Sequence, residues 1–212
     1  MNPFEPLIEK ILQHFAGPEF KGELAQAKSE FFDGPLDEEN SESFDLRMCQ
    51  FYDWYFFTRE VSGYGQTPLE VCHLVRELRF SEEEKALIND LKSHRHSLFQ
   101  FIKIKDQDIY LKDLLKNEKV VVKKSDLVFG FNTEEIFEVR LIPWRGSFVF
   151  TKGFSFHPSD AQKFIFNEIK RHRKDPDLDP ELMMLRLIKM RFRFERYKHV
   201  KPELIYSNES KI

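Results

Sequence analysis

The sequence predicts an α+β protein with a helical N-terminal part, a small antiparallel β-barrel of the SH3-like or OB-like kind in the middle, and a helical C-terminal extension. Three observations lead to this prediction. Apolar residues recur at helical spacing in the first 95 residues, short segments rich in Val, Ile and Phe alternate with turn residues from 98 to 151, and helical spacing returns after Phe156. We therefore place boundaries at 1–95, 96–156 and 157–212, either as separate parts or as one composite domain.

The first part carries start and stop signals for several helices. Gly17-Pro18 ends an apolar stretch of helical spacing, Thr67-Pro68 reads as an N-cap followed by proline at the first helical position, and Ser81-Glu82-Glu83-Glu84 is a capping box. Together these signals predict helices at about 4–15, 19–32, 44–59, 68–78 and 81–91. The acidic stretch 36–43 predicts a loop.

An aromatic run from Phe51 to Phe57 dominates the third of these helices. It holds six aromatic residues in seven positions, interrupted only by Asp53. At about 100° per residue the rings point in every direction, and a helix that is apolar all round is a buried one. Asp53 is therefore either a carboxylate bonded to a backbone group or an arginine, or a candidate acid or base in a spatially assembled site.

The middle part reads as short antiparallel strands. Turn residues at 105–108 and 143–146 separate apolar segments. The pattern predicts strands at about 97–104, 108–112, 118–124, 126–131, 135–142 and 147–152. Strands of this number and length form a small rolled sheet, whose order the sequence leaves open.

The C-terminal part contains the strongest binding signal. A start signal at 157–160 opens one helix, and a proline-rich linker at 175–180 precedes a last helix from about 181 to 199. That last helix has one apolar stripe of Met183, Leu187, Met190, Phe194 and Tyr197, and a second of Met184, Leu185, Ile188 and Phe192. Between the stripes lie the basic residues Arg186, Lys189, Arg191, Arg193, Arg196 and Lys198.

Each of these surfaces has an ordinary and a functional interpretation. One apolar stripe packs on the host domain, and the other packs within the chain, on a second copy or on a different protein. The basic residues are either a solvated surface or contacts for nucleic-acid phosphates, which lysine and arginine bind without sequence preference. A net charge of −3 and a pI near 6.2 weigh against nucleic acid, because nucleic-acid-binding domains are usually basic.

Composition and missing motifs narrow the function classes. The two cysteines, Cys49 and Cys72, fit a reducing compartment, and we find neither a signal peptide nor an apolar run of the about 20 residues that span a bilayer. His94 and His96 lack the paired spacings of a zinc site, and there is no nucleophile elbow or phosphate-binding loop. We expect a cytoplasmic protein without metal, cofactor or membrane contact, and favour a protein that is not an enzyme.

Residues 44–156 resemble a module of uncharacterised bacterial proteins that often end in a cysteine-rich SEC-C zinc motif. The matching pieces are Asp53-Trp54-Tyr55-Phe56-Phe57, Thr67-Pro68-Leu69, Ser81-Glu82-Glu83-Glu84, Ser97-Leu98-Phe99, Leu111-Lys112-Asp113-Leu114-Leu115 and Val139-Arg140-Leu141-Ile142-Pro143. No cysteine follows Cys72, so the SEC-C zinc site itself is not expected here. The resemblance supports the fold and implies no activity.

The expected function is that of a non-enzymatic cytoplasmic binding or scaffold module that acts through the barrel rim and the C-terminal basic helix. Its partner is expected to be another protein or a second copy of the chain, through Met184, Leu185, Ile188 and Phe192. The alternative is a nucleic-acid-binding or ribosome-associated protein that uses the basic residues of the last helix. A third hypothesis is an enzyme whose site includes Asp53.

Overall fold

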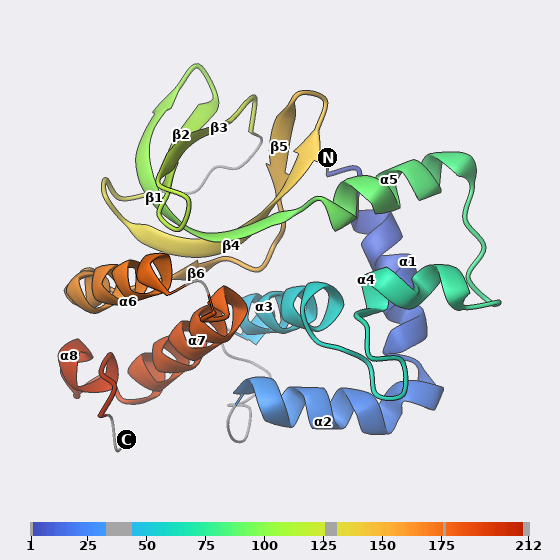
Figure 1. Ribbon diagram of the computed structural model, residues 1–212, viewed down its shortest axis with the longest axis horizontal. Helices are drawn as coiled ribbons and strands as arrows, with labels where there is room; N and C mark the ends of the chain where they lie inside the picture. The colour runs from blue at the N-terminus through green and yellow to red at the C-terminus, as the bar shows by residue number, and fades with distance from the viewer. Residues whose placement is uncertain (1, 33–43, 126–130, 176, 210–212) are drawn as a thin grey trace. The chain divides into compact units, whose positions relative to one another are not determined.

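A computed structural model describes residues 2–32, 44–125, 131–175 and 177–209 and confirms the predicted fold class. Helices lie toward both ends of the sequence, and a curled antiparallel half-barrel occupies the middle (Figure 1). The predicted loop at 36–43 lies outside the described residues. So does the strand predicted at 126–131, apart from Phe131.

The chain forms two compact units. The first consists of Met1–Arg95 and Arg140–Gly153, and the second of His96–Val139 and Phe154–Ile212. Strand β4 (Ile136–Trp144) contributes its first residues to the second unit and its remaining residues to the first. The sequence-based division at residues 95 and 156 remains a prediction.

Helices build most of the first unit. They are α1 (Glu5–Phe15), α2 (Lys21–Phe32), α3 (Phe44–Phe57), α4 (Pro68–Val71) and α5 (Glu82–Lys92), with short 3-10 turns at Pro18–Phe20 and Cys72–Leu74. The predicted capping box at Ser81 forms before α5, and the predicted N-cap Thr67 before α4 forms a capping box with Glu70 that was not predicted. The helix predicted to reach residue 78 ends earlier, because Val75 adopts an extended conformation after the second 3-10 turn.

The aromatic run of α3 forms the core of this unit, as its all-round apolar pattern predicts. Phe51, Tyr55 and Phe56 are completely buried, and the Tyr55 hydroxyl donates a hydrogen bond of 2.9 Å to the Phe15 carbonyl. Next to the run, the buried Arg59 guanidinium forms ion pairs with Glu23 of α2 and Glu30 of α2. Rings and ion pairs together join α3 to the two preceding helices.

The sheet contains β1 (Arg95–Lys105), β2 (Asp108–Asp113), β3 (Glu118–Val122), β4, β5 (Ser147–Phe150) and β6 (Ser155–Phe156). The strand order is β3-β2-β1-β4-β5, and β6 pairs with β4. Five of the strands match predicted ones, whereas the two-residue β6 was not predicted. The register between β1 and β2 shifts between Phe101 and Lys103, which marks a bulge that bends the strand.

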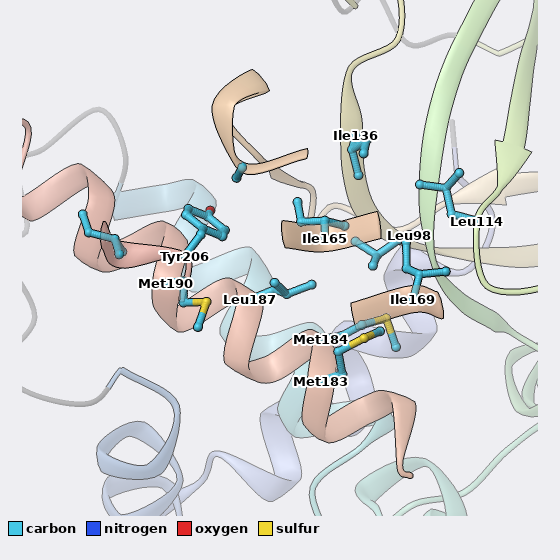
Figure 2. Packing of buried hydrophobic residues seen from close by; sticks show 12 residues of the cluster. Leu98, Leu114, Ile136, Ile165, Ile169, Met183, Met184, Leu187, Met190 and Tyr206 are labelled. Atoms are coloured by element: carbon cyan, nitrogen blue, oxygen red, sulfur yellow. The ribbon is translucent and has the colours of Figure 1, made fainter. Parts of the chain in front are cut away.

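Three helices complete the second unit: α6 (Gln162–Lys174), α7 (Pro180–Arg196) and α8 (Pro202–Ile205). Figure 2 shows Ile165 and Ile169 of α6 and Leu187 of α7 gathered beside Leu98 and Ile136 of the sheet. Met183 and Met190 of α7 belong to the same hydrophobic cluster, and Phe194 and Tyr197 pack against it partly buried. The first apolar stripe of the last helix therefore packs within the chain, as one of the two stripes was expected to do.

Candidate functional site

The four residues predicted to bind a partner protein lie on α7, and little of their surface is exposed. Met184, Ile188 and Phe192 are buried, and Leu185 is half-buried. Met184 belongs to the hydrophobic cluster of the second unit. This burial gives no support to a partner-binding stripe on the helix, and a protein partner there remains a prediction.

The six basic residues of α7 and its C-terminal end are not brought together as one free cationic surface. Arg186 forms an ion pair with Glu168 and donates to the Asn208 side chain at 2.9 Å. Arg191 donates from Nε to the Phe156 carbonyl at 2.7 Å and forms an ion pair with Glu195 at 3.0 Å. Both guanidinium groups thus already hold neighbouring elements. Of the remaining four, Lys189 and Arg193 are half-buried, and Arg196 and Lys198 are exposed.

Asp53 is partly exposed on α3 and accepts a hydrogen bond from the backbone N–H of Gly153 at 3.2 Å. A hydrogen bond to a backbone group is one of the roles that the sequence suggests for Asp53, and this contact is such a bond. Cys49, one turn before Asp53, carries a thiol whose pKa is raised, first by burial and then by the Asp53 charge. A thiol held protonated in this way is a poor nucleophile.

The first unit contains a small cleft of about 260 Å³. Its walls come from α3, α5 and the segment around α4, and include the rings of Phe57, His73 and His94. The His94 ring lies 4.5 Å from the Phe57 ring, and its Nδ1 atom lies 2.9 Å from the Leu91 carbonyl. Asp53 does not line this cleft. The volume is below the range of about 300–1,000 Å³ that is usual for small-molecule sites.

A histidine whose side chain is only 6% exposed lies between two carboxylates in the second unit. His96 of β1 places Nε2 2.9 Å from Glu138 of β4, and Nδ1 2.8 Å from both oxygens of Glu181 at the start of α7. An ionised carboxylate only accepts hydrogen bonds, so each contact places a proton on the ring nitrogen or on the carboxyl group that faces it. This arrangement anchors α7 to the sheet. It was not predicted, because the three residues are far apart in sequence.

The outer side of the half-barrel presents a set of cationic side chains. Along β2, Ile109, Leu111 and Asp113 point to the buried side and Tyr110 and Lys112 to the other. Pairing with the neighbouring strands continues this outer side in two rows. We call these six residues the cationic face: Gln100, Lys112 and Lys119 in one row, and Lys103, Tyr110 and Val121 in the other.

Two lysines of the cationic face lie directly opposite each other. Lys112 of β2 is the register partner of Lys119 of β3. Like charges at such positions lower the stability of a sheet. In the other row the Lys103 ammonium lies over the Tyr110 ring, 5.0 Å from its centroid. Lys103 and Lys119 are exposed, and Tyr110 and Lys112 are half-exposed.

The acidic residues of β2 do not neutralise these lysines, because their carboxylates hold turns. Asp113 is buried, and its Oδ1 accepts hydrogen bonds from the Ser97 hydroxyl at 2.6 Å and from two backbone N–H groups at 3.0 Å. Asp108 accepts a bond from the backbone N–H of Lys124 at 3.0 Å. No acidic residue belongs to either row of the cationic face. Period-2 alternation of the strands was the signal that could have found this face, but only the register places Lys112 against Lys119.

The described ranges contain neither a cluster of metal-ligating side chains nor a helix that could cross a bilayer. Within residues 2–32, 44–125, 131–175 and 177–209, no group of three or more His, Cys, Asp or Glu side chains is arranged to hold a metal ion. None of the helices described there combines the length and the apolar character needed to cross a bilayer.

Comparison with known protein families gives a match over most of the chain. The model of a family of unknown function, DUF7986, matches residues 5–184, which include α1 through the first residues of α7. No curated protein and no solved structure matches the chain.

Proposed function

Because the chain belongs to this family of unknown function, we propose a function from its own surface: it is a non-enzymatic cytoplasmic module that binds nucleic acid through the cationic face of the half-barrel. The observation that carries the proposal is the opposed pair Lys112 and Lys119, next to Lys103 and Tyr110. Family membership fits the predicted uncharacterised module. Its link with bacterial proteins that often carry a SEC-C zinc motif remains part of the proposal.

Edge protection is the ordinary explanation for lysines on a strand, and it accounts for only one of the pair. Strand β3 stands at the end of the strand order, and lysine on an edge strand discourages pairing with other chains. Strand β2 lies between β1 and β3, so Lys112 has no edge to protect. Two lysines that face each other lower stability, and an anion bound between them removes that cost.

A nucleic acid suits this surface better than a protein does. The face combines three lysines with an aromatic ring on an antiparallel sheet, which is the usual composition of sheet surfaces that bind phosphates and bases. The net charge of the chain is −3, so attraction must come from this local patch rather than from the whole molecule. A protein partner would be favoured by an exposed apolar stripe, and the stripe predicted on α7 is mostly buried.

The C-terminal helix is the alternative surface, and a matched pair of variants separates the two. Lys112→Glu/Lys119→Glu reverses two charges on the cationic face, and Lys189→Glu/Lys198→Glu reverses two on α7 and just after it. Both variants change the net charge by the same amount. Binding of fluorescently labelled single-stranded and duplex oligonucleotides is measured by anisotropy at several salt concentrations, with thermal melting to verify folding.

We expect the variant of the cationic face to lose most of the binding and the α7 variant to retain it. Three phosphate contacts, by Lys103, Lys112 and Lys119, give a slope of log K against log salt of about −2 for a single strand, and reversing two of them removes about two thirds of it. Loss of binding only in the α7 variant would move the site to the helix. Absence of oligonucleotide binding by the wild-type chain at low salt would refute the proposal.

A further inference from the structure

Tyr110 gives the cationic face a feature that phosphate binding alone does not require. The ring lies in the middle strand of the three, with Lys103 on one side of it in register and Val121 on the other. An aromatic ring flanked by an aliphatic side chain and a lysine can take a base on its surface. Duplex nucleic acid keeps its bases stacked inside, so only an unpaired strand can use such a ring.

We infer that the cationic face binds single-stranded nucleic acid, with one unpaired base stacked on Tyr110 and adjacent phosphates held by Lys103, Lys112 and Lys119. This inference rests on the proposed function and specifies its ligand. The position of Lys103 over the ring, 5.0 Å from the centroid, supports it. An ammonium group at this distance interacts with the same π surface that a base would cover, and its flexible stem lets it move to a phosphate.

The geometry of the two rows suits a single-stranded nucleic acid that crosses the β-sheet. Tyr110 and Lys112 are two residues apart on β2, so both side chains point to the same side about 7 Å apart along the strand. Lys119 and Lys103 extend the charge to the two neighbouring strands. A nucleic acid laid across these three β-strands therefore meets a lysine on each of them and the Tyr110 ring at the centre.

The test compares four probes of the same length, about 12 nucleotides, which is within the site sizes of small single-strand-binding folds. The probes are a single strand, its duplex, an abasic strand with the same phosphates, and linear polyphosphate. The proteins are the wild type, Tyr110→Phe, Tyr110→Leu and Lys112→Glu/Lys119→Glu. The abasic comparison uses wild-type protein and so does not depend on how any variant folds.

We expect the wild type to bind the single strand more tightly than the abasic strand, by roughly 5- to 150-fold, the range for the loss of one stacked base. Tyr110→Leu should weaken single-strand binding by a similar factor and leave polyphosphate binding within about twofold, since only the stacking is lost. Tyr110→Phe, which keeps the ring, should match the wild type.

Two results overturn the inference while the proposed function stands. One is equal wild-type affinity for the single strand and the abasic strand. The other is a Tyr110→Leu variant that binds all four probes as the wild type does, while Lys112→Glu/Lys119→Glu binds none. If the wild type binds neither oligonucleotide form, the proposed function fails first and the inference fails with it.

Discussion

The Asp53 carboxylate and the Gly153 backbone are in contact, with Oδ2 of Asp53 accepting the Gly153 N–H at 3.2 Å. The contact joins α3 to the segment that follows β5. A Cβ atom placed on Gly153 would lie 2.5 Å from the same oxygen and 2.8 Å from the Asp53 Cγ. Glycine is therefore required here by the carboxylate that covers it. This contact explains Asp53 as a structural residue, and an enzymatic role for it remains only a prediction.

Gly153→Ala should lower the free energy of unfolding by about 1–3 kcal/mol, because the new methyl group has no room beside Asp53. Urea unfolding measures this change. Gly22→Ala, in helix α2, is the matched control. A Cβ there meets nothing within 4 Å, so alanine should raise stability by up to about 1 kcal/mol through its helix propensity. Equal effects of the two substitutions would contradict the steric explanation.

The Asp53→Ala background provides a second check on this contact. Removal of the carboxylate frees the space that the Gly153→Ala methyl needs, so the cost of the second substitution should fall by about 1 kcal/mol or more. Additive costs in the double variant would mean that another neighbour opposes the methyl group.

Sequence patterns predicted the elements of this fold better than the contacts between them. The N-cap at Thr67 and the capping box at Ser81 are local signals, and both form as predicted. The stripe that contains Leu187 packs in the core because helical spacing determines which side chains share a face. Spacing does not say which residue lies opposite, so neither the pair Lys112 and Lys119 nor the contact of Asp53 with Gly153 could be predicted.

Strand β6 and the environment of His96 show the same limit. A two-residue strand has too little sequence to show alternation, and it forms because Phe156 and Ser155 pair with Phe137 and Glu138 of β4. In the sequence, His96 shows only its spacing to His94. Its partners come from β4 and α7, which only the folded chain brings together.

Lys119→Glu should raise stability and lower nucleic-acid affinity at the same time. The substitution places an acidic side chain opposite Lys112, and an opposite-charge pair across two strands adds about 0.2–1 kcal/mol where the like pair subtracts a similar amount. Thermal melting at low salt measures the stability. In Lys112→Glu/Lys119→Glu, like charges face each other again, so its stability should be close to that of the wild type. A destabilised Lys119→Glu would show that the two side chains do not interact.

His96→Leu should lower the free energy of unfolding at pH 7 by about 3–5 kcal/mol, because it leaves the Glu138 carboxylate buried without its imidazole partner. The double variant His96→Leu/Glu138→Leu removes both polar side chains and should recover much of the loss. Urea unfolding of the three proteins measures the difference. Equal losses in the single and double variants would show that leucine packing, rather than the buried charge, sets the cost.

His157 makes the second unit sensitive to acid. Burial, and after it the positive charge of Arg191, lowers the pKa of this histidine to about 3. Its Nδ1 lies 3.1 Å from the Tyr206 hydroxyl, and the pKa of that phenol is raised, first of all by burial. Between about pH 6.5 and pH 3 the unfolded chain therefore binds a proton at His157 that the folded chain does not.

The free energy of unfolding consequently falls as the pH is lowered through this window, by up to about 1.4 kcal/mol per pH unit from His157 alone. The stabilising contribution of His157 is fully present above pH 6.5. Between pH 7.5 and pH 5 the expected loss from this residue is about 2 kcal/mol. His157→Gln cannot take up the proton, so its unfolding free energy should depend less on pH by that amount, although the variant is less stable at pH 7.5. Urea unfolding at the two pH values measures both quantities, with His199→Gln as the control for replacing an exposed histidine. If His157→Gln keeps the wild-type difference between the two pH values, the acid sensitivity arises elsewhere.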